Sequence, residues 1–393
     1  MNALRVLLVH NAYQQSGGED SVVADELALL RRKGHEVIEL RRDNQEIQTI
    51  SRPSLAVQTL WSSATQRQAL ALLREHRPAV VHVHNTFPLI SPSLYWACAR
   101  AGIPVVQTLH NFRLACPQAM FLREGRVCES CLGKTPWPAL AHGCYRNSRV
   151  QTAVVVGMLA LHRTLKTFEQ KVTRYIALNE FCKAKFIQAG LPAQRIAVKP
   201  NFADVALPLR GRPARQGMLF VGRLSSEKGI EVLAQAWGGC PGLSLRVAGT
   251  GPASVALESQ PGVQMLGHRS PVQVQAEMQS ALALVLPSIC FENFPRTLVE
   301  AFGAGLPVIA SRIGALAELI HHGETGLLFN PGDAQDLGRV MRWAADHPLK
   351  MAEMGGNARA CYESHYTSDI NYEQLMTIYR SALADCNTSA RHE

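Results

Sequence analysis

Residues 286–311, LPSICFENFPRTLVEAFGAGLPVIAS, predict a buried strand, a polar corner, a helix and a second strand. Pro295 suits the start of the helix, because its fixed φ angle matches and its missing N–H would be unpaired there. Glu292 is therefore expected in the corner and Glu300 on the helix. A helix start offers unpaired N–H groups and the positive end of a dipole, so the corner suits an anionic ligand such as a phosphate.

Apolar, β-branched runs alternate with helix-patterned stretches along most of the chain, which is typical of parallel sheets covered on both faces. The chain has 393 residues, enough for two domains. The fold class is predicted to be α/β, with two doubly wound, Rossmann-like domains whose strand-end loops face a central cleft. We expect the strands at residues 4–10, 36–41, 79–84, 103–109, 174–178, 195–199, 218–222, 243–248, 263–266, 283–287, 307–310 and 326–329.

The expected domain boundaries follow from composition along the chain. The proline-rich stretch 200–216 is predicted to be a linker. It separates a first domain, residues 1–202, from a second domain, residues 203–365. A last helical segment, residues 366–393, is expected to pack back on the first domain.

Composition and charge restrict the class of protein. Hydrophobic residues make up 47% of the chain and charged residues 18%, which is typical of a folded soluble protein. The first residues, MNALRVLLVHN, lack a signal-peptide pattern and are too short to span a bilayer, so we expect a cytoplasmic protein. With no export signal, the ten cysteines are expected to be reduced or metal-bound.

Positive charge is concentrated in the first half. Residues 1–200 carry 25 Lys and Arg against 13 Asp and Glu, whereas the remainder carries 15 against 18. Unless it is only a solvated surface, the basic half favours an anionic partner: nucleic acid, an anionic membrane or a pyrophosphate-bearing substrate.

Several residues at predicted strand ends are candidates for ligand binding. In VGRLSSEKGIEVL, Arg223 and Lys228 flank a turn and suit a pyrophosphate, although a solvated loop would look the same. In VAGTGP, Gly249 and Gly251 allow either a close approach of the backbone to a nucleotide or a tight turn.

The first domain offers a glycine turn and a strand-end histidine. Gly17 and Gly18, in QQSGGEDS, would bring N–H groups toward phosphates or a sugar, or would simply form a surface turn. His110 ends the run VVQTLHN, as either a ligand or a structural residue. Asn85 is an acceptor-side candidate, with His84 as a neighbour.

Residues 112–149 form an irregular, cysteine-rich insertion without a clear strand or helix, and such long segments are usually functional or disordered. The spacing C-x11-C-x2-C-x12-C supplies four thiols for a structural zinc ion, with His142 as a substitute ligand. Free cysteines and a redox role are the alternatives. The four cysteines are Cys116, Cys128, Cys131 and Cys144.

The apolar stretch 150–165 is flanked by arginines and lysines. It is too short to span a bilayer and is expected to be a core helix. The alternative is a helix in a membrane interface, near a lipid-linked substrate.

Glu292 and Glu300 in E-x7-E, followed by G-x-G-x-P-V-I-A, resemble the nucleotide-sugar site of family 4 glycosyltransferases. The order of the glycine loop, the strand-end histidine and R-x4-K is similar as well. The resemblance implies the GT-B fold and a retaining, metal-independent enzyme. The donor is implied to be a UDP-, GDP- or other nucleoside-diphosphate sugar, with no cofactor for catalysis.

The resemblance also implies roles for individual residues. Arg223 and Lys228 neutralise the departing diphosphate, and Glu300 takes the ribose hydroxyls. His110 contacts the sugar, and the leaving phosphate accepts the proton of the acceptor. The remaining donor contacts are Gly17, Gly18 and Gly249, the sugar-binding Glu292, Asn293 and Phe294, and the N–H groups near Thr297 and Leu298.

Charge and family together suggest a glycan or polyprenyl-pyrophosphate-linked acceptor, in bacterial envelope or exopolysaccharide biosynthesis. The protein would then be peripheral at the inner face of an anionic membrane, and no nucleic acid is expected. The alternatives are a GT-B sugar-nucleotide epimerase, which product analysis without acceptor would reveal, and a basic, zinc-containing nucleic-acid-binding protein, which steep salt dependence would reveal. The second of these leaves residues 203–365 unexplained.

Overall fold

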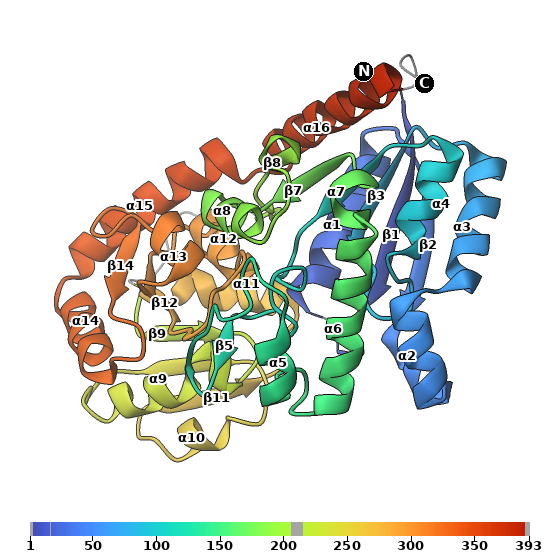
Figure 1. Ribbon diagram of the computed structural model, residues 1–393. Coiled ribbons are helices and arrows are strands. Elements are labelled where there is room, and N and C mark those ends of the chain that lie inside the picture. Colours follow the sequence, from blue (N-terminus) through green and yellow to red (C-terminus); the bar gives the residue numbers. More distant parts are fainter. Residues whose placement is uncertain (1–2, 16, 206–214, 390–393) are drawn as a thin grey trace. The chain divides into compact units, whose positions relative to one another are not determined.

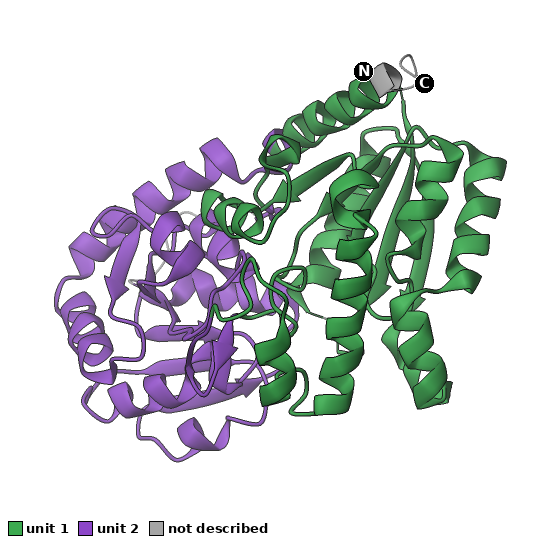
Figure 2. Cartoon of the chain, in the orientation of Figure 1, with its two compact units in different colours: residues 1–120, 129–200, 371–393 green, residues 121–128, 201–370 purple. Residues whose placement is uncertain are grey.

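The computed structural model describes residues 3–15, 17–205 and 215–389. Two compact units make up the chain (Figure 2). Unit 1 comprises residues 1–120, 129–200 and 371–393, and unit 2 comprises residues 121–128 and 201–370. Most of the predicted linker, residues 206–214, lies outside the described residues.

Unit 1 contains a parallel six-stranded sheet in the order β2-β1-β3-β4-β7-β8 (Figure 1). Its central strands β3 and β4 are fully buried, as expected for a parallel sheet covered on both faces, and they combine valines with buried polar residues such as His82 and His84. The strands are β1 (Arg5–Ala12), β2 (Glu36–Asp43), β3 (Val80–Asn85), β4 (Val105–Thr108), β7 (Arg174–Ala177) and β8 (Ile196–Val198).

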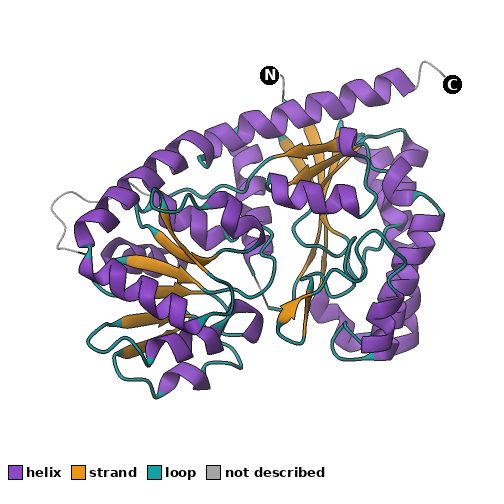
Figure 3. Cartoon of the chain, turned by 60° about the vertical axis from the view of Figure 1, so that its left-hand side comes forward, coloured by secondary structure: helices purple, strands orange, loops and turns teal. Residues whose placement is uncertain are grey.

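Helices lie on both faces of this sheet (Figure 3). One face packs against the last helix of the chain, α16, through Leu375, Met376, Tyr379 and Ala382. The helices that belong wholly or mostly to unit 1 are α1 (Gly18–Arg32), α2 (Arg52–Leu60), α3 (Ser63–His76), α4 (Ser93–Ala101), α5 (Trp137–His142), α6 (Arg149–Thr164), α7 (Thr167–Gln170), α8 (Glu180–Gln188) and α16 (Ser368–Ser389), with 3-10 turns η1 (Asn44–Thr49) and η2 (Ala193–Arg195).

Unit 2 contains a second parallel sheet, in the order β11-β10-β9-β12-β13-β14. Its strands are β9 (Met218–Val221), β10 (Leu245–Ala248), β11 (Val263–Gly267), β12 (Ala283–Leu286), β13 (Val308–Ser311) and β14 (Gly326–Phe329). The helices are α9 (Ile230–Trp237), α10 (Val255–Glu258), α11 (Pro271–Ser280), α12 (Arg296–Gly303), α13 (Gly314–Leu319), α14 (Ala334–Asp346) and α15 (Pro348–His365), with the 3-10 turn η3 (Ser226–Lys228). All twelve predicted strands are present, so the α/β fold class is confirmed.

The cysteine-rich insertion is more regular than the sequence predicted. It contains helix α5 and a hairpin of two short strands, β5 (Leu122–Arg123) and β6 (Arg126–Val127). The hairpin belongs to unit 2, where the buried ring of Phe121 packs edge to face on Phe291 at 5.9 Å between centroids. Its turn at Glu124 and Gly125 has positive φ angles, and an ordinary charged loop gives little signal for such a turn.

The apolar stretch 150–165 forms α6, a core helix. Val155, Val156 and Leu159 are buried, at the spacing of one helical face. Ser148 caps the helix by accepting a hydrogen bond from the Gln151 N–H. No helix among the described residues is long and apolar enough to cross a membrane.

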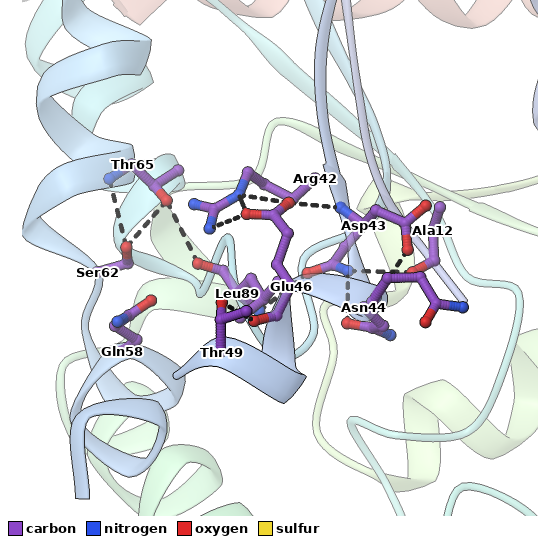
Figure 4. Close-up of polar contacts among 12 residues, drawn as sticks. Ala12, Arg42, Asp43, Asn44, Glu46, Thr49, Gln58, Ser62, Thr65 and Leu89 are labelled. Carbon is purple, nitrogen blue, oxygen red and sulfur yellow. Dashed lines mark hydrogen bonds and ion pairs between the residues drawn. The ribbon is translucent and has the colours of Figure 1, made fainter. Parts of the chain in front are cut away.

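Polar contacts close the carboxyl end of β2 (Figure 4). Arg42 donates to both carboxylate oxygens of Glu46, and one of these oxygens also accepts from the Asp43 N–H. Asn44 accepts a hydrogen bond of 2.8 Å from the Asn11 side chain, at the end of β1. Hydrogen bonds therefore connect the ends of β1 and β2.

Candidate active site

Neighbouring strands bring three histidines of unit 1 close together. His10 lies near the end of β1 and His84 near the end of β3, while His110 follows β4 by two residues. Because β3 pairs with both β1 and β4, these strand ends are adjacent. The Nδ1 atom of His84 lies 2.8 Å from Nε2 of His110, and their rings stack. His110 and Asn85, both predicted site residues, line one pocket of unit 1.

A buried carboxylate holds the histidines of β3. Glu26 on α1 is 1% exposed, and its Oε1 lies 2.9 Å from His82 Nδ1 and 3.3 Å from His84 Nε2. The other oxygen, Oε2, lies 3.2 Å from the ammonium of Lys199, which is 2% exposed. Asn371 also accepts from Lys199, so residues from four regions of the chain meet here. Glu26 and Lys199 were not predicted from the sequence, because they lie in an ordinary helix pattern and directly after an ordinary strand pattern.

Glu26, His82 and His84 have the residue types of a metal site. Among the described residues they are the one group of three such side chains whose ligand atoms lie within 4.8 Å of one another. Lys199, however, already neutralises the carboxylate. A divalent cation would leave two net positive charges out of water, which costs several kcal/mol. We therefore interpret the cluster as an ion-pair and hydrogen-bond network.

Burial determines the protonation of this network. It lowers the pKa of His84 to about 4, and the neighbouring His82 adds to this effect. Burial also lowers the pKa of His110 well below its usual value. For Glu26, burial alone would raise the pKa, but Lys199 and His82 more than compensate and hold it well below the usual range. At neutral pH, Glu26 is thus ionised, and His84 and His110 are neutral.

The glycine loop lies at the start of α1, as predicted. One of its backbone N–H groups, however, already donates a hydrogen bond within the protein. The Gly17 N–H donates to the Asp20 carboxylate at 2.9 Å, which is the half of a capping box that a glycine can form. Asp20 in turn contacts His10 Nε2 at 2.8 Å. A Cβ at Gly17 or Gly18 would meet nothing within 4 Å, so the space beside this loop is open.

Glu19 is a second carboxyl group of α1 that sequence analysis did not single out. It accepts hydrogen bonds from Tyr13 at 2.9 Å and Asn111 at 3.3 Å. Burial raises its pKa to about 8, against the lowering effect of these two hydrogen bonds. Its place directly after the glycine pair was the only signal in the sequence.

In unit 2, Arg223 and Lys228 are both paired with carboxylates. Arg223 follows β9 and donates to Glu227 at 2.7 Å, and its side chain is 59% exposed. Lys228 donates to Glu292 at 2.6 Å, and Ser288 donates to the same carboxylate oxygen. The turn η3 and the corner before α12 thus meet, and the two predicted phosphate-binding cations lie at the carboxyl end of the sheet.

Two of these groups, Lys228 and Glu227, have pKa values shifted toward the charged form. Burial opposes the charge on Lys228, but Glu292 outweighs it and raises the lysine pKa. Burial likewise opposes ionisation of Glu227, and hydrogen bonds from Ser225 and Arg223 lower its pKa overall. An anionic ligand at this edge would replace one anionic partner of the cations with another.

Glu300 lies on α12 and Glu292 in the loop before it, as predicted from the corner. Glu300 accepts a hydrogen bond of 2.8 Å from Arg296, one turn earlier on the helix. The Leu298 N–H already donates to the Pro295 carbonyl, so it is less available to a ligand than predicted. Asn293 and Phe294 are buried, and Phe294 packs on Tyr366.

The glycines after β10 are required by backbone packing. A Cβ on Gly249 would collide with the carbonyl oxygen of Gly222, and one on Gly251 with that of Leu224. Both glycines also have positive φ angles, at 146° and 158°. Packing between neighbouring turns thus accounts for them, and a ligand contact at Gly249 stays a prediction.

The four cysteines of the insertion divide between the two units. Cys131 and Cys144 share a small apolar cluster in unit 1 with Ala139 and Val156. Cys116 also belongs to unit 1, whereas Cys128 belongs to unit 2. This cluster places Cys131 and Cys144 near one another, and zinc binding by the four cysteines stays a prediction.

Two Rossmann-like units, each with polar side chains at the carboxyl ends of its strands, define the GT-B architecture. Residues 16–207 match the family Glycosyltransferase Family 4, and residues 212–360 match Glycosyl transferases group 1. The chain belongs to this family of glycosyltransferases.

Relatives and solved structures agree with the family. The chain is 34% identical over 158 residues to the D-rhamnosyltransferase WbpZ of Pseudomonas aeruginosa, covering 38% of this chain and 41% of the relative. It is 26% identical to the D-inositol 3-phosphate glycosyltransferase of Rhodococcus opacus, covering 80% and 71%. The first curated relatives are matched over only 41% to 55% of their lengths.

Two solved structures share the fold at low identity. Sucrose-phosphate synthase from Thermosynechococcus elongatus superimposes with a TM-score of 0.73 at 18% identity, covering 97% of this chain and all of that one. Anabaena HepE in complex with UDP gives a TM-score of 0.67 at 18% identity, covering 96% and 100%.

Proposed function

We propose that the protein transfers a sugar from a nucleoside-diphosphate sugar to a glycan or lipid-linked acceptor. The observation that carries this proposal is the pair of cations, Arg223 and Lys228, at the carboxyl end of the unit 2 sheet. Each is held by an exchangeable carboxylate, so a diphosphate would find a cationic site already ordered. A related fold, HepE, was solved with UDP and with UDP-glucose.

In the proposed reaction, Arg223 and Lys228 neutralise the charge that develops on the leaving diphosphate. When the diphosphate binds, Glu292 leaves Lys228 and turns to the sugar. Glu300 leaves Arg296 and accepts hydrogen bonds from the ribose hydroxyls. The acceptor oxygen bonds to the anomeric carbon on the face from which the diphosphate leaves as the carbon–oxygen bond to the diphosphate breaks, so the sugar keeps its anomeric configuration. The departing phosphate takes the acceptor proton, so no protein base or metal ion is needed.

For the acceptor, we propose a polyprenyl-pyrophosphate-linked glycan at an anionic membrane surface, in envelope polysaccharide assembly. The support is the excess of Lys and Arg in residues 1–200. Because α6 uses its apolar face in the core, attraction would come from surface charge, at about 1 kcal/mol for each basic residue near the membrane. Equal sedimentation with neutral and anionic vesicles would remove this part of the proposal.

A panel of nucleotide sugars tests the central proposal. We expect one nucleoside diphosphate and its sugar to raise the melting temperature and to be slowly hydrolysed without acceptor. The variant Arg223→Ala should lose the thermal shift. The matched control is Arg246→Ala, which removes an arginine that is also paired with a carboxylate in unit 2 but lies on β10 itself. Equal thermal shifts in both variants would contradict the proposed site.

A further inference from the structure

The contacts around Glu26 determine which nitrogen of His110 carries the proton. Three groups form a row: the Glu26 carboxylate, the ring of His84 and the ring of His110. The atoms that face one another are Glu26 Oε1 and His84 Nε2, at 3.3 Å, and His84 Nδ1 and His110 Nε2, at 2.8 Å. All three groups belong to unit 1.

The Glu26 carboxylate determines which nitrogen of His84 carries the hydrogen. Glu26 is buried beside the Lys199 ammonium and is ionised, so it offers only acceptor atoms. His84 Nε2 lies 3.3 Å from this carboxylate, outside hydrogen-bond geometry, and has no other hydrogen-bond partner among the described residues. Electrostatics still favours a hydrogen on Nε2, because a lone pair directed at a buried carboxylate would be repelled. His84 is therefore protonated on Nε2.

The protonation of His84 determines which atom donates in its hydrogen bond with His110. A neutral imidazole carries a single N–H, so with Nε2 protonated the Nδ1 atom has a lone pair. His84 is neutral because it is buried. In the 2.8 Å hydrogen bond, His110 Nε2 must then be the donor.

Donation from Nε2 determines the protonation of the other ring nitrogen of His110, Nδ1. His110 is also neutral, so donation from Nε2 leaves a lone pair on Nδ1. In the part of the chain that the structure describes, no partner for this Nδ1 is found. His110 lines a pocket together with Asn85, Asn111 and Arg113.

We propose that Glu26, acting through His84, is a positioning residue that holds His110 with Nδ1 as a hydrogen-bond acceptor for a substrate hydroxyl. This makes His110 a group that receives a hydroxyl hydrogen rather than one that donates a proton. The proposal rests on the proposed function only for the identity of that hydroxyl, as part of a sugar. The tautomer itself follows from the contacts together with the neutral state of the two buried histidines.

The test removes the carboxylate without leaving a buried charge unpaired. The double variant Glu26→Met/Lys199→Met replaces both members of the pair by apolar side chains, which is often tolerated in a core. The matched control is Arg31→Met/Glu39→Met. It removes another ion pair of α1, with a 2.8 Å contact, that lies at the surface.

The readout is the ¹⁵N spectrum of the histidine side chains, which needs no substrate. The variant His110→Gln identifies the His110 signals among the 14 histidines. In the unaltered protein and in the surface control, we expect Nδ1 of His110 to be unprotonated. In Glu26→Met/Lys199→Met, His110 should divide between its two tautomers.

Activity provides a second readout. With the constraint lost, the fraction of protein with a competent His110 should fall to about one half or less, and kcat/KM should fall by about 2- to 10-fold. Nδ1 protonation in the unaltered protein, or an unchanged tautomer in the double variant, would overturn the proposal. Failure of the nucleotide-sugar panel would instead remove the proposed function and leave the tautomer result standing.

Discussion

In unit 1 the polar side chains near the strand ends are buried histidines held by a carboxylate and a lysine, whereas in unit 2 they are partly exposed ion pairs, with Arg223 59% and Lys228 28% exposed. The partners in unit 1 come from distant parts of the chain: Glu26 and Lys199 are 173 residues apart, and His82 and Tyr379 are 297 apart. In unit 2, Arg223 pairs with Glu227 and Arg296 with Glu300, each four residues away.

The charged groups of the two units therefore have different roles. The unit 1 network is closed and out of water, so its charges position other groups and are costly to disturb. Two of the unit 2 pairs are local, whereas Lys228 and Glu292 are 64 residues apart. The most exposed pair is Arg223–Glu227, so a ligand can replace the partner of Arg223 at little cost. The following changes test that contrast.

The largest expected effect is on the stability of unit 1. Lys199→Met leaves the Glu26 carboxylate buried without its cation, which should cost about 3–5 kcal/mol in the free energy of unfolding, measured with urea. Lys185→Met is the control, because the Lys185–Glu129 pair of the same unit is partly exposed and should cost about 0–1 kcal/mol. Similar losses in the two variants would show that the Glu26 network is not special.

A large loss of activity is expected from unit 2. Arg223→Ala and Glu300→Ala should each lower the rate of sugar transfer by about 100-fold, because a preorganised binding group is removed. Arg223→Ala should change urea unfolding by no more than about 1 kcal/mol, because its side chain is 59% exposed. Glu300→Ala should cost more, because it removes a carboxylate that pairs with the mostly buried Arg296 guanidinium. Near-normal turnover in both purified variants would contradict the assignment of Arg223 and Glu300 to the donor site.

A moderate effect of pH is expected at Glu19. Burial raises its pKa from 4.5 to about 8, so between these values the folded protein holds a proton that the unfolded chain releases. Stability should therefore fall as pH rises through this window. Glu19→Gln should remove that fall and be more stable at pH 8 by about 1–2 kcal/mol, allowing for screening.

The control for this pH effect is Glu75→Gln, whose side chain is 70% exposed and should change little with pH. Urea unfolding at several pH values provides the measurement. If the unaltered protein and Glu19→Gln follow the same pH dependence, Glu19 ionises like an ordinary surface carboxyl.

The smallest expected effect is at Glu227. Glu227→Gln weakens the hold on Arg223 and should tighten binding of a nucleoside diphosphate by about 2- to 5-fold, the value of one exposed ion pair. Isothermal titration with UDP and GDP would measure it. Weaker binding would mean that Glu227 orients Arg223 rather than competing with the ligand.

Most of the fold could be predicted from the sequence, because period and composition are local signals. Buried parallel strands are continuous apolar runs, and these located all twelve strands. The helix start between Glu292 and Glu300 could also be predicted, because Pro295 favours the beginning of a helix through its own backbone geometry. The hairpin at Leu122–Val127 was missed, because its strands are only two residues long.

The sequence by itself determined the α/β class, the paired sheets and the positions of Arg223, Lys228 and His110 near strand ends. Tertiary structure alone decided the partners. It paired Lys228 with Glu292 and brought Glu26, Lys199 and His84 together. Charge, burial and tautomer depend on neighbours that are far apart in the chain, and no local pattern encodes them.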